Sequence, residues 1–165
     1  MAHILSVLVE NRPGVLTRIS GLISRRAFNI ESITAGYTEE PNITRITIVV
    51  NGDDLEIEQV TNQLAKLVDV IKIVDQTRID SLERELVLIK VRASAEKRSE
   101  IVDIVNIFRA NIVDVNRETM VIELTGSQDK NDALCEVLQD HGIVEIVRTG
   151  KIVISRGPIA AKELM

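Results

Sequence analysis

One hydrophobic pattern occurs twice in this chain of 165 residues, and the repetition constrains its fold more than any other feature. An offset of 82 residues aligns the early part of the two copies. The aligned pairs are Val7 with Ile89, Val9 with Val91, Ile19 with Ile101, Ile23 with Val105, Asn29 with Asn111 and Ile30 with Ile112. Further along, an offset of 74 pairs Ile48 with Ile122, because the first copy has the longer middle loop at residues 38–42. The sequence is an internal duplication, so two similar domains are expected.

Each copy reads as strand, helix, strand, strand, helix, strand. The helices are predicted from apolar spacings of three and four residues and the strands from β-rich runs and alternation. In the first copy, the predicted strands are 4–9, 29–37, 44–50 and 70–75, and the predicted helices are 14–26 and 55–68. A charged connector follows at residues 77–85. In the second copy, the predicted strands are 86–91, 111–115, 120–124 and 143–147, and the predicted helices are 101–108 and 132–138.

Apolar residues gather on one face of the predicted elements. Val15, Ile19 and Ile23 share one face of the first helix, while Ile46 and Ile48 alternate with polar residues in a strand. Such one-sided patterns place helices on one face of an antiparallel sheet. We therefore predict the α+β class, with two ferredoxin-like βαββαβ domains at residues 1–77 and 78–165. Domains this small bury a marginal core, so dimerisation is expected.

The composition limits the kind of partner. Hydrophobic residues make up 45% of the chain and aromatic residues 2%, and the formal net charge is −5. The aliphatic content excludes disorder, while the acidity and the scarcity of rings disfavour nucleic acid as a partner. The N-terminus lacks a basic leader, and no apolar run is long enough for a membrane span. We expect a cytoplasmic protein that binds a protein or a small molecule, with no nucleic acid or membrane partner.

The two copies differ in the loop before their first helix. In the first copy, Asn11 and Gly14 lie in the loop of residues 10–16, where a helix start can offer free N–H groups to an anion. At the matching positions the second copy has Ala93 and Glu96. Asn11 as a simple N-cap is the structural alternative. Because the fold does not require this chemistry in both copies, the difference indicates a ligand site in the first copy alone.

The other polar candidates favour structural roles. Asn29 follows the predicted first helix and is interpreted as a C-cap residue or a ligand contact. Since the two ends of that helix lie at opposite poles of such a domain, a ligand touching Gly14 and Asn29 must bridge two protomers. Cys135 is expected to be a buried thiol, and the acidic residues at 53–58 are expected to favour a helix start. No catalytic residue and no metal site are predicted.

The residues also support a family resemblance. The run at 4–16 contains Asn-Arg-Pro-Gly-Val-Leu, which is typical of ACT-type amino-acid-binding domains, and residues 28–33 read Phe-Asn-Ile-Glu-Ser-Ile. Together with residues 66–70, 107–110 and 148–157, they make the whole chain resemble the small regulatory subunit of acetohydroxyacid synthase (acetolactate synthase). The resemblance implies an N-terminal ACT domain and a C-terminal ACT-like domain.

The resemblance further implies a chain that is not an enzyme. It would activate the catalytic large subunit of acetohydroxyacid synthase and confer feedback inhibition by valine or another branched-chain amino acid. The chain itself would carry no cofactor, whereas the catalytic partner would use thiamine diphosphate, Mg and FAD. A homodimer formed through the ACT domains would hold the effector between two chains.

The effector site is carried over by position. One chain would contribute the helix-start residues and its partner the residues after the helix, with two further residues nearby. The set is Asn11, Gly14, Val15, Leu16, Asn29, Ile30, Thr34 and Gly36. Gly36 stands where other members can have Ala, which leaves the preferred effector open.

Two alternatives compete with this interpretation. A stand-alone enzyme of ferredoxin-like fold, such as an acylphosphatase, would use Arg12 or Arg18 with Asn29, although it would not explain the second copy. An ACT-type regulator of a different partner, such as a transcription regulator, would share the loop but should carry a basic helix-turn-helix segment, which the sequence lacks.

Overall fold

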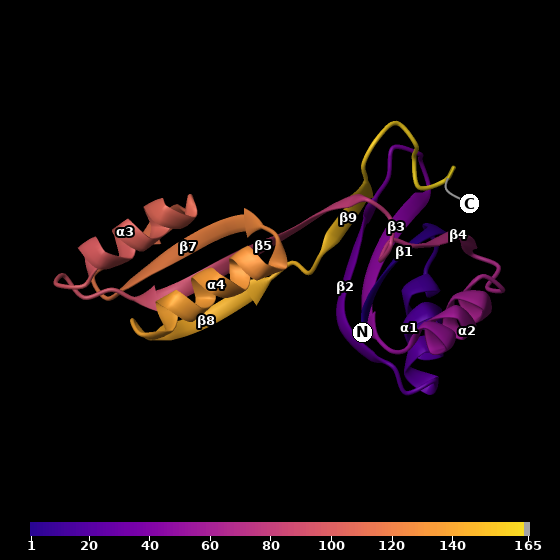
Figure 1. Ribbon diagram of the computed structural model, residues 1–165, viewed down its shortest axis with the longest axis horizontal. Coiled ribbons are helices and arrows are strands. Elements are labelled where there is room, and N and C mark those ends of the chain that lie inside the picture. Colours follow the sequence, from indigo (N-terminus) through magenta and orange to yellow (C-terminus); the bar gives the residue numbers. More distant parts are fainter. Residues whose placement is uncertain (164–165) are drawn as a thin grey trace. The chain divides into compact units, whose positions relative to one another are not determined.

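The computed structural model describes residues 1–163, which form two compact units. The first unit contains Met1–Leu82 together with the chain from Lys151 onward, and the second contains Glu83–Gly150 (Figure 1). The predicted division at residues 77 and 78 differs in two respects, because the boundary lies between Leu82 and Glu83 and the C-terminal segment returns to the first unit. Val153 of this segment packs against Ile4 and Val49, which explains the return.

The first unit has the predicted βαββαβ order. Its four strands form an antiparallel sheet in the order β2-β3-β1-β4, and α1 and α2 lie on one face of it (Figure 1). The elements are β1 (Ala2–Glu10), α1 (Val15–Arg25), β2 (Asn29–Tyr37), β3 (Ile43–Asn51), α2 (Asp54–Leu64) and β4 (Val70–Asp75). The fold class predicted from the apolar spacing is therefore confirmed for this unit.

The second unit repeats the order, and its sheet runs β6-β7-β5-β8, with a further strand, β9, paired to β5. The elements are β5 (Ser81–Arg92), α3 (Arg98–Phe108), β6 (Asn111–Val115), β7 (Thr119–Gly126), α4 (Gln128–Gln139) and β8 (Ile143–Arg148). The further strand, β9 (Ile152–Ser155), lies in the C-terminal segment that belongs to the first unit. The prediction missed β9 and placed residues 81–85 in a connector, whereas they begin β5. Four residues of β9 are too few for a periodic signal to stand out.

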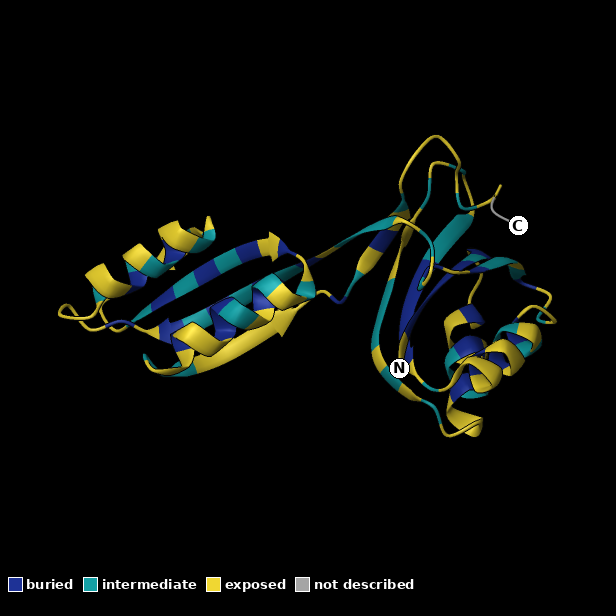
Figure 2. Ribbon diagram, viewed as in Figure 1, coloured by how far each residue is buried: buried dark blue, intermediate teal, exposed yellow. Residues whose placement is uncertain are grey.

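Each unit has its own aliphatic core between helices and sheet. Val15, Ile19 and Ile23 of α1 are buried against the strands, as their spacing predicts (Figure 2). In the second unit, Ile101 and Val105 of α3 are buried in the same way. Among the described residues, no helix is long and apolar enough to cross a lipid bilayer.

The start of α2 explains the acidic residues at 53–58. The Asp53 side chain accepts a hydrogen bond from the backbone N–H of Glu56 at 2.8 Å, and the Glu56 carboxylate accepts one from the N–H of Asp53 at 3.1 Å. This reciprocal pair is a capping box, which satisfies two N–H groups at the helix start. The interpretation of these acids as helix-start residues is confirmed.

The face of the first sheet that points away from α1 and α2 is covered by the C-terminal segment. Ile4 and Leu8 alternate with core residues of β1 and so point away from the helices. Val153 of β9 covers Ile4 and Val49 on this face. The C-terminal segment therefore closes a sheet face that the helices leave open.

The duplication allows a matched test of the two cores. Ile48 and Ile122 are both 0% exposed at equivalent positions of central strands. We expect Ile48→Ala and Ile122→Ala each to lower the free energy of unfolding of their own unit by about 2–5 kcal/mol, because each leaves a cavity. Hydrogen exchange of the amides in β3 and β7 measures the two units separately. Equal loss of protection in both units from either substitution would contradict independent cores.

Candidate functional site

The loop before α1 is shaped by a glycine. Gly14 has φ 83°, in the left-handed region, and is the N-cap residue of α1. Most residues with a Cβ are strained in this conformation, so the backbone favours glycine here. The alternative in which Asn11 caps the helix is wrong, because the helix begins only at Val15, after a turn at Pro13 and Gly14.

The start of α1 is open to an anion in a way that the other described helices are not. No side chain caps α1, and its first turn contains no acidic residue. By contrast, α2 and α4 are capped by the side chains of Asp53 and Ser127, and the first turn of α3 contains Glu100. The first-turn N–H groups of Leu16 and Thr17 therefore have neither a capping side chain nor an acidic residue in their own turn.

Backbone hydrogen bonds fix this loop to two other parts of the unit. The N–H of Asn11 donates to the carbonyl of Asn42 at 2.7 Å, and the N–H of Glu10 donates to the carbonyl of Asp69 at 2.9 Å. Arg18 forms an ion pair with the Asp69 carboxylate. The sequence did not identify Asn42 or Asp69 as loop supports, because their contacts depend on segments distant in the chain.

A cavity of about 410 Å³ lies beside this loop. Its lining residues are Glu10, Asn11, Arg12, Asn42, Ile43 and Ile71. Of these lining residues, Asn11 belongs to the predicted effector site. The guanidinium of Arg12 is paired with the Glu10 carboxylate at 2.8 Å.

The apolar residues of the predicted site divide into buried and exposed groups. The Val15 side chain is 4% exposed and belongs to the core, so only its backbone can face a ligand. Ile30 is half-buried against the same core. Leu16 is 46% exposed and offers an aliphatic surface next to the open helix start.

Asn29 has no structural role in the turn after α1. The left-handed residue there is Ala27, with φ 59°, and its equivalent in the second copy is Arg109, with φ 54°. The C-cap interpretation of Asn29 and Asn111 is therefore wrong, because both asparagines begin strands instead. An exposed Asn29 that the turn does not require is free to contact a ligand.

Asn29 lies far from Asn11 within one chain. In β3, Asn29 pairs with Asn51 while Glu10 pairs with Ile43, at the opposite end of the strand. At about 3.4 Å per residue, these ends are about 27 Å apart. The predicted effector residues thus form two separate groups in one chain. The same separation contradicts an acylphosphatase-like site that joins Arg12 or Arg18 to Asn29.

Thr34 and Gly36 lie on β2, which is an edge strand of the first sheet. They pair with Thr47 and Arg45, on the sheet face that points away from the helices. A Cβ added to Gly36 would meet no atom within 4 Å. The position therefore has room for the side chain that other members can carry.

The equivalent loop of the second unit is closed. Ala93 is fully buried, and the Arg98 side chain donates hydrogen bonds to the carbonyls of Ala93 and Asn116 at 3.3 and 2.5 Å. Glu96 precedes α3, whose first-turn acid is Glu100. A hydrogen bond from His141 chiefly lowers the pKa of Glu100, with a contribution from Lys97. This helix start already has a carboxylate beside it.

Cys135 and His141 have separate partners. The buried Cys135 thiol lies 3.7 Å from an Arg148 nitrogen, and burial raises its pKa. His141 contacts Glu100 at 3.1 Å. Among the described residues, no cluster of three His, Cys, Asp or Glu side chains could hold a metal ion.

The fold and the loop define a class: a protein with two ferredoxin-like units of the ACT type, of which the first has an open helix start. Two family models match the chain, "AHAS small subunit-like ACT domain" over residues 5–72 and "Small subunit of acetolactate synthase" over residues 84–157. The chain belongs to the family of acetolactate synthase small subunits.

Individual relatives agree with this assignment. The chain is 54% identical to the probable acetolactate synthase small subunit of Archaeoglobus fulgidus, over 95% of this chain and 98% of the relative. It is 53% identical to the acetolactate synthase small subunit of Mycolicibacterium smegmatis, over 94% and 92%. The crystal structure of the small subunit from Thermotoga maritima matches with a TM-score of 0.88 and 42% identity, covering 96% of this chain and 99% of that one.

The two site glycines predict opposite effects on stability. Gly14→Ala should lower the free energy of unfolding by about 1–2 kcal/mol, because alanine is strained at φ 83°. Gly36→Ala should leave it unchanged or raise it by up to about 1 kcal/mol, because the site has space and the unfolded chain loses freedom. Urea unfolding of both variants measures the difference. Equal destabilisation by the two substitutions would refute the conformational argument.

Proposed function

We propose that this chain is the non-catalytic regulatory subunit of a cytoplasmic acetolactate synthase. It activates the catalytic large subunit and makes the complex sensitive to feedback inhibition by valine or another branched-chain amino acid. Membership in the small-subunit family and the ACT-type fold support this proposal. The chain contributes no cofactor, and the thiamine diphosphate, Mg and FAD of the reaction belong to the catalytic partner.

The open start of α1 is the observation that carries the effector proposal. An amino acid has a carboxylate, which the free N–H groups of Leu16 and Thr17 can bind with help from the helix dipole. Gly14 lets the ligand approach the backbone closely because it has no Cβ. In the second unit, Arg98 closes the equivalent loop and Glu100 lies in the first turn of the helix.

The rest of the ligand needs a second chain. Leu16 offers an aliphatic surface and Asn11 a side-chain oxygen for the ammonium group, while Asn29 and Ile30 lie at the other end of the sheet. A two-fold dimer brings the Asn29 end of one chain to the Gly14 end of its partner, and it does so twice. In the sheet of the first unit, β2 is an edge strand, and an edge strand is a common place for such a contact.

The expected affinity is physically reasonable. Valine has about eight heavy atoms, and binding in the millimolar to micromolar range needs about −0.5 to −1 kcal/mol per atom. Feedback then requires that the effector bind one arrangement of the dimer more tightly than another. The free energy available for inhibiting the catalytic subunit is the difference between the binding free energies of the effector in the two arrangements.

Two variants of the same shape but different charge test the carboxylate position. Gly14→Asp should raise the valine concentration for half-inhibition of the reconstituted complex by at least about tenfold, because the new carboxylate competes for the open N–H groups. Gly14→Asn has the same shape and the same tolerance of left-handed backbone, so it controls for strain and bulk. Activation of the catalytic subunit should persist in both variants. If the Asp and Asn variants were equally sensitive to valine, the carboxylate of valine would not bind at the start of α1.

The stoichiometry follows from the difference between the copies. Because the first unit alone has an open helix start, each chain should bind one valine, giving two equivalent sites in a dimer. Titration calorimetry of the full chain at known concentration measures this number, and Asn29→Ala should weaken binding at both sites equally. Saturation near two valines per chain would show that the second unit also binds.

A further inference from the structure

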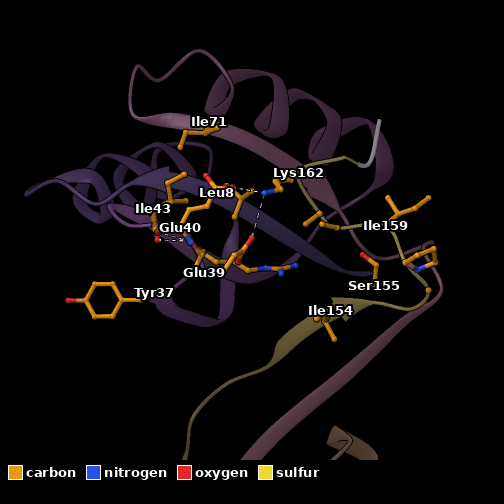
Figure 3. Close-up of a pocket in the computed structure, with 16 residues that line it drawn as sticks. Leu8, Tyr37, Glu39, Glu40, Ile43, Ile71, Ile154, Ser155, Ile159 and Lys162 are labelled. Carbon is orange, nitrogen blue, oxygen red and sulfur yellow. Dashed lines mark hydrogen bonds and ion pairs between the residues drawn. The ribbon is translucent and has the colours of Figure 1, made fainter.

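A second cavity, of about 500 Å³, lies on the sheet face of the first unit that points away from the helices (Figure 3). Leu8, Ile43 and Ile71 line it from the strands, while Ile154 and Ile159 line it from the C-terminal segment (Figure 3). None of the predicted effector residues lines this cavity. Its volume lies within the range of about 300–1,000 Å³ that is usual for small-molecule pockets.

Two polar groups at this cavity lack hydrogen-bond partners among the described residues. Arg45 lines the cavity, and its Nε donates to the Ser6 hydroxyl at 2.8 Å while its Nη2 is buried and unpaired. Ser155 lines the cavity from β9, and its hydroxyl is also buried and unpaired. Leaving buried donors unpaired is costly, so an acceptor that reached both would be stabilised.

Arg45 and Lys162 are the two cations that line the cavity, and they differ in how they contact its two acids, Glu39 and Glu40. Lys162 lies between Glu40, at 2.5 Å, and Glu39, at 3.9 Å, so the acidic groups already have a cation (Figure 3). No carboxylate among the described residues forms an ion pair with Arg45. Burial lowers the pKa of Arg45 from its ordinary value, with Glu39 opposing the shift, and an arginine remains charged at neutral pH.

We propose that this cavity binds a small aliphatic monocarboxylate. The carboxylate accepts hydrogen bonds from Arg45 and Ser155, and the aliphatic body packs against the isoleucine walls. The two unpaired donors favour a ligand group with acceptor oxygens, and the Glu40 carboxylate that could hold an ammonium group is already paired with Lys162. The site is separate from the proposed effector site, so it stands or falls independently of the proposed function.

Hexanoate and its uncharged analogue hexanamide are the probes, titrated into the full chain by calorimetry. Hexanoate should bind with a dissociation constant on the order of 1 mM, and hexanamide at least about tenfold more weakly, since charge-assisted hydrogen bonds are the stronger kind. Arg45→Gln should weaken hexanoate binding by at least about tenfold. Arg12→Gln is the matched control, because Arg12 does not line the cavity and should leave binding unchanged.

A second pair of variants guards against loss of folding in Arg45→Gln. Ending the chain after Arg156 removes Ile159 and Lys162 from the cavity wall but retains β9, and it should abolish hexanoate binding. Ser155→Ala should weaken binding several-fold with an unchanged unfolding temperature. The proposal is overturned if hexanoate does not bind the full chain, if hexanamide binds equally well, or if Arg45→Gln and Arg12→Gln behave alike.

Discussion

A four-stranded sheet has two faces, and two helices on one side can bury only one of them. This constraint governs the first unit, in which β1 and β3 direct alternate residues to opposite faces. The helix side is filled by α1 and α2. On the other side the chain returns from Lys151 to place Val153 over Ile4 and Val49. The cover is incomplete, because a cavity of about 500 Å³ remains between the strands and the rest of that segment. Lys162 in this segment pairs with Glu40, and its carbonyl accepts a hydrogen bond from Lys72.

The two copies show which features the fold needs and which it merely permits. Both keep the aliphatic core, and both use a left-handed residue after the first helix, Ala27 and Arg109, although neither is glycine or asparagine. The loops before those helices have diverged. The first copy keeps Gly14 in a left-handed conformation with an open helix start, whereas Arg98 fills the corresponding space in the second. Because the second copy folds without that loop, the fold alone does not account for the loop in the first.

The sequence was sufficient to predict the order of the elements and their inner faces, because the backbone itself imposes the periods of helix and strand. It singled out the loop with Gly14 from the difference between the two copies, but the left-handed backbone of Gly14 is known only from the structure. It did not predict β9, whose cover of Ile4 is a contact between opposite ends of the chain. It also extended α2 to Val68, whereas the helix ends at Leu64 and the following turns carry Leu67 back to the core. Such errors arise where contacts distant in sequence override a local pattern.

The middle hairpin of the first unit connects the two cavities. The carbonyl of Asn42 accepts a hydrogen bond from the backbone N–H of Asn11 in the loop before α1. Glu40, two residues before Asn42, forms an ion pair with Lys162 at the cavity beside the C-terminal segment. Ile43 and Ile71 line both cavities. A ligand that shifts this hairpin from either side therefore changes the wall of the other cavity. Linkage requires that any such effect be mutual: if a carboxylate beneath the C-terminal segment alters the affinity for valine, valine must alter the affinity for that carboxylate by the same factor.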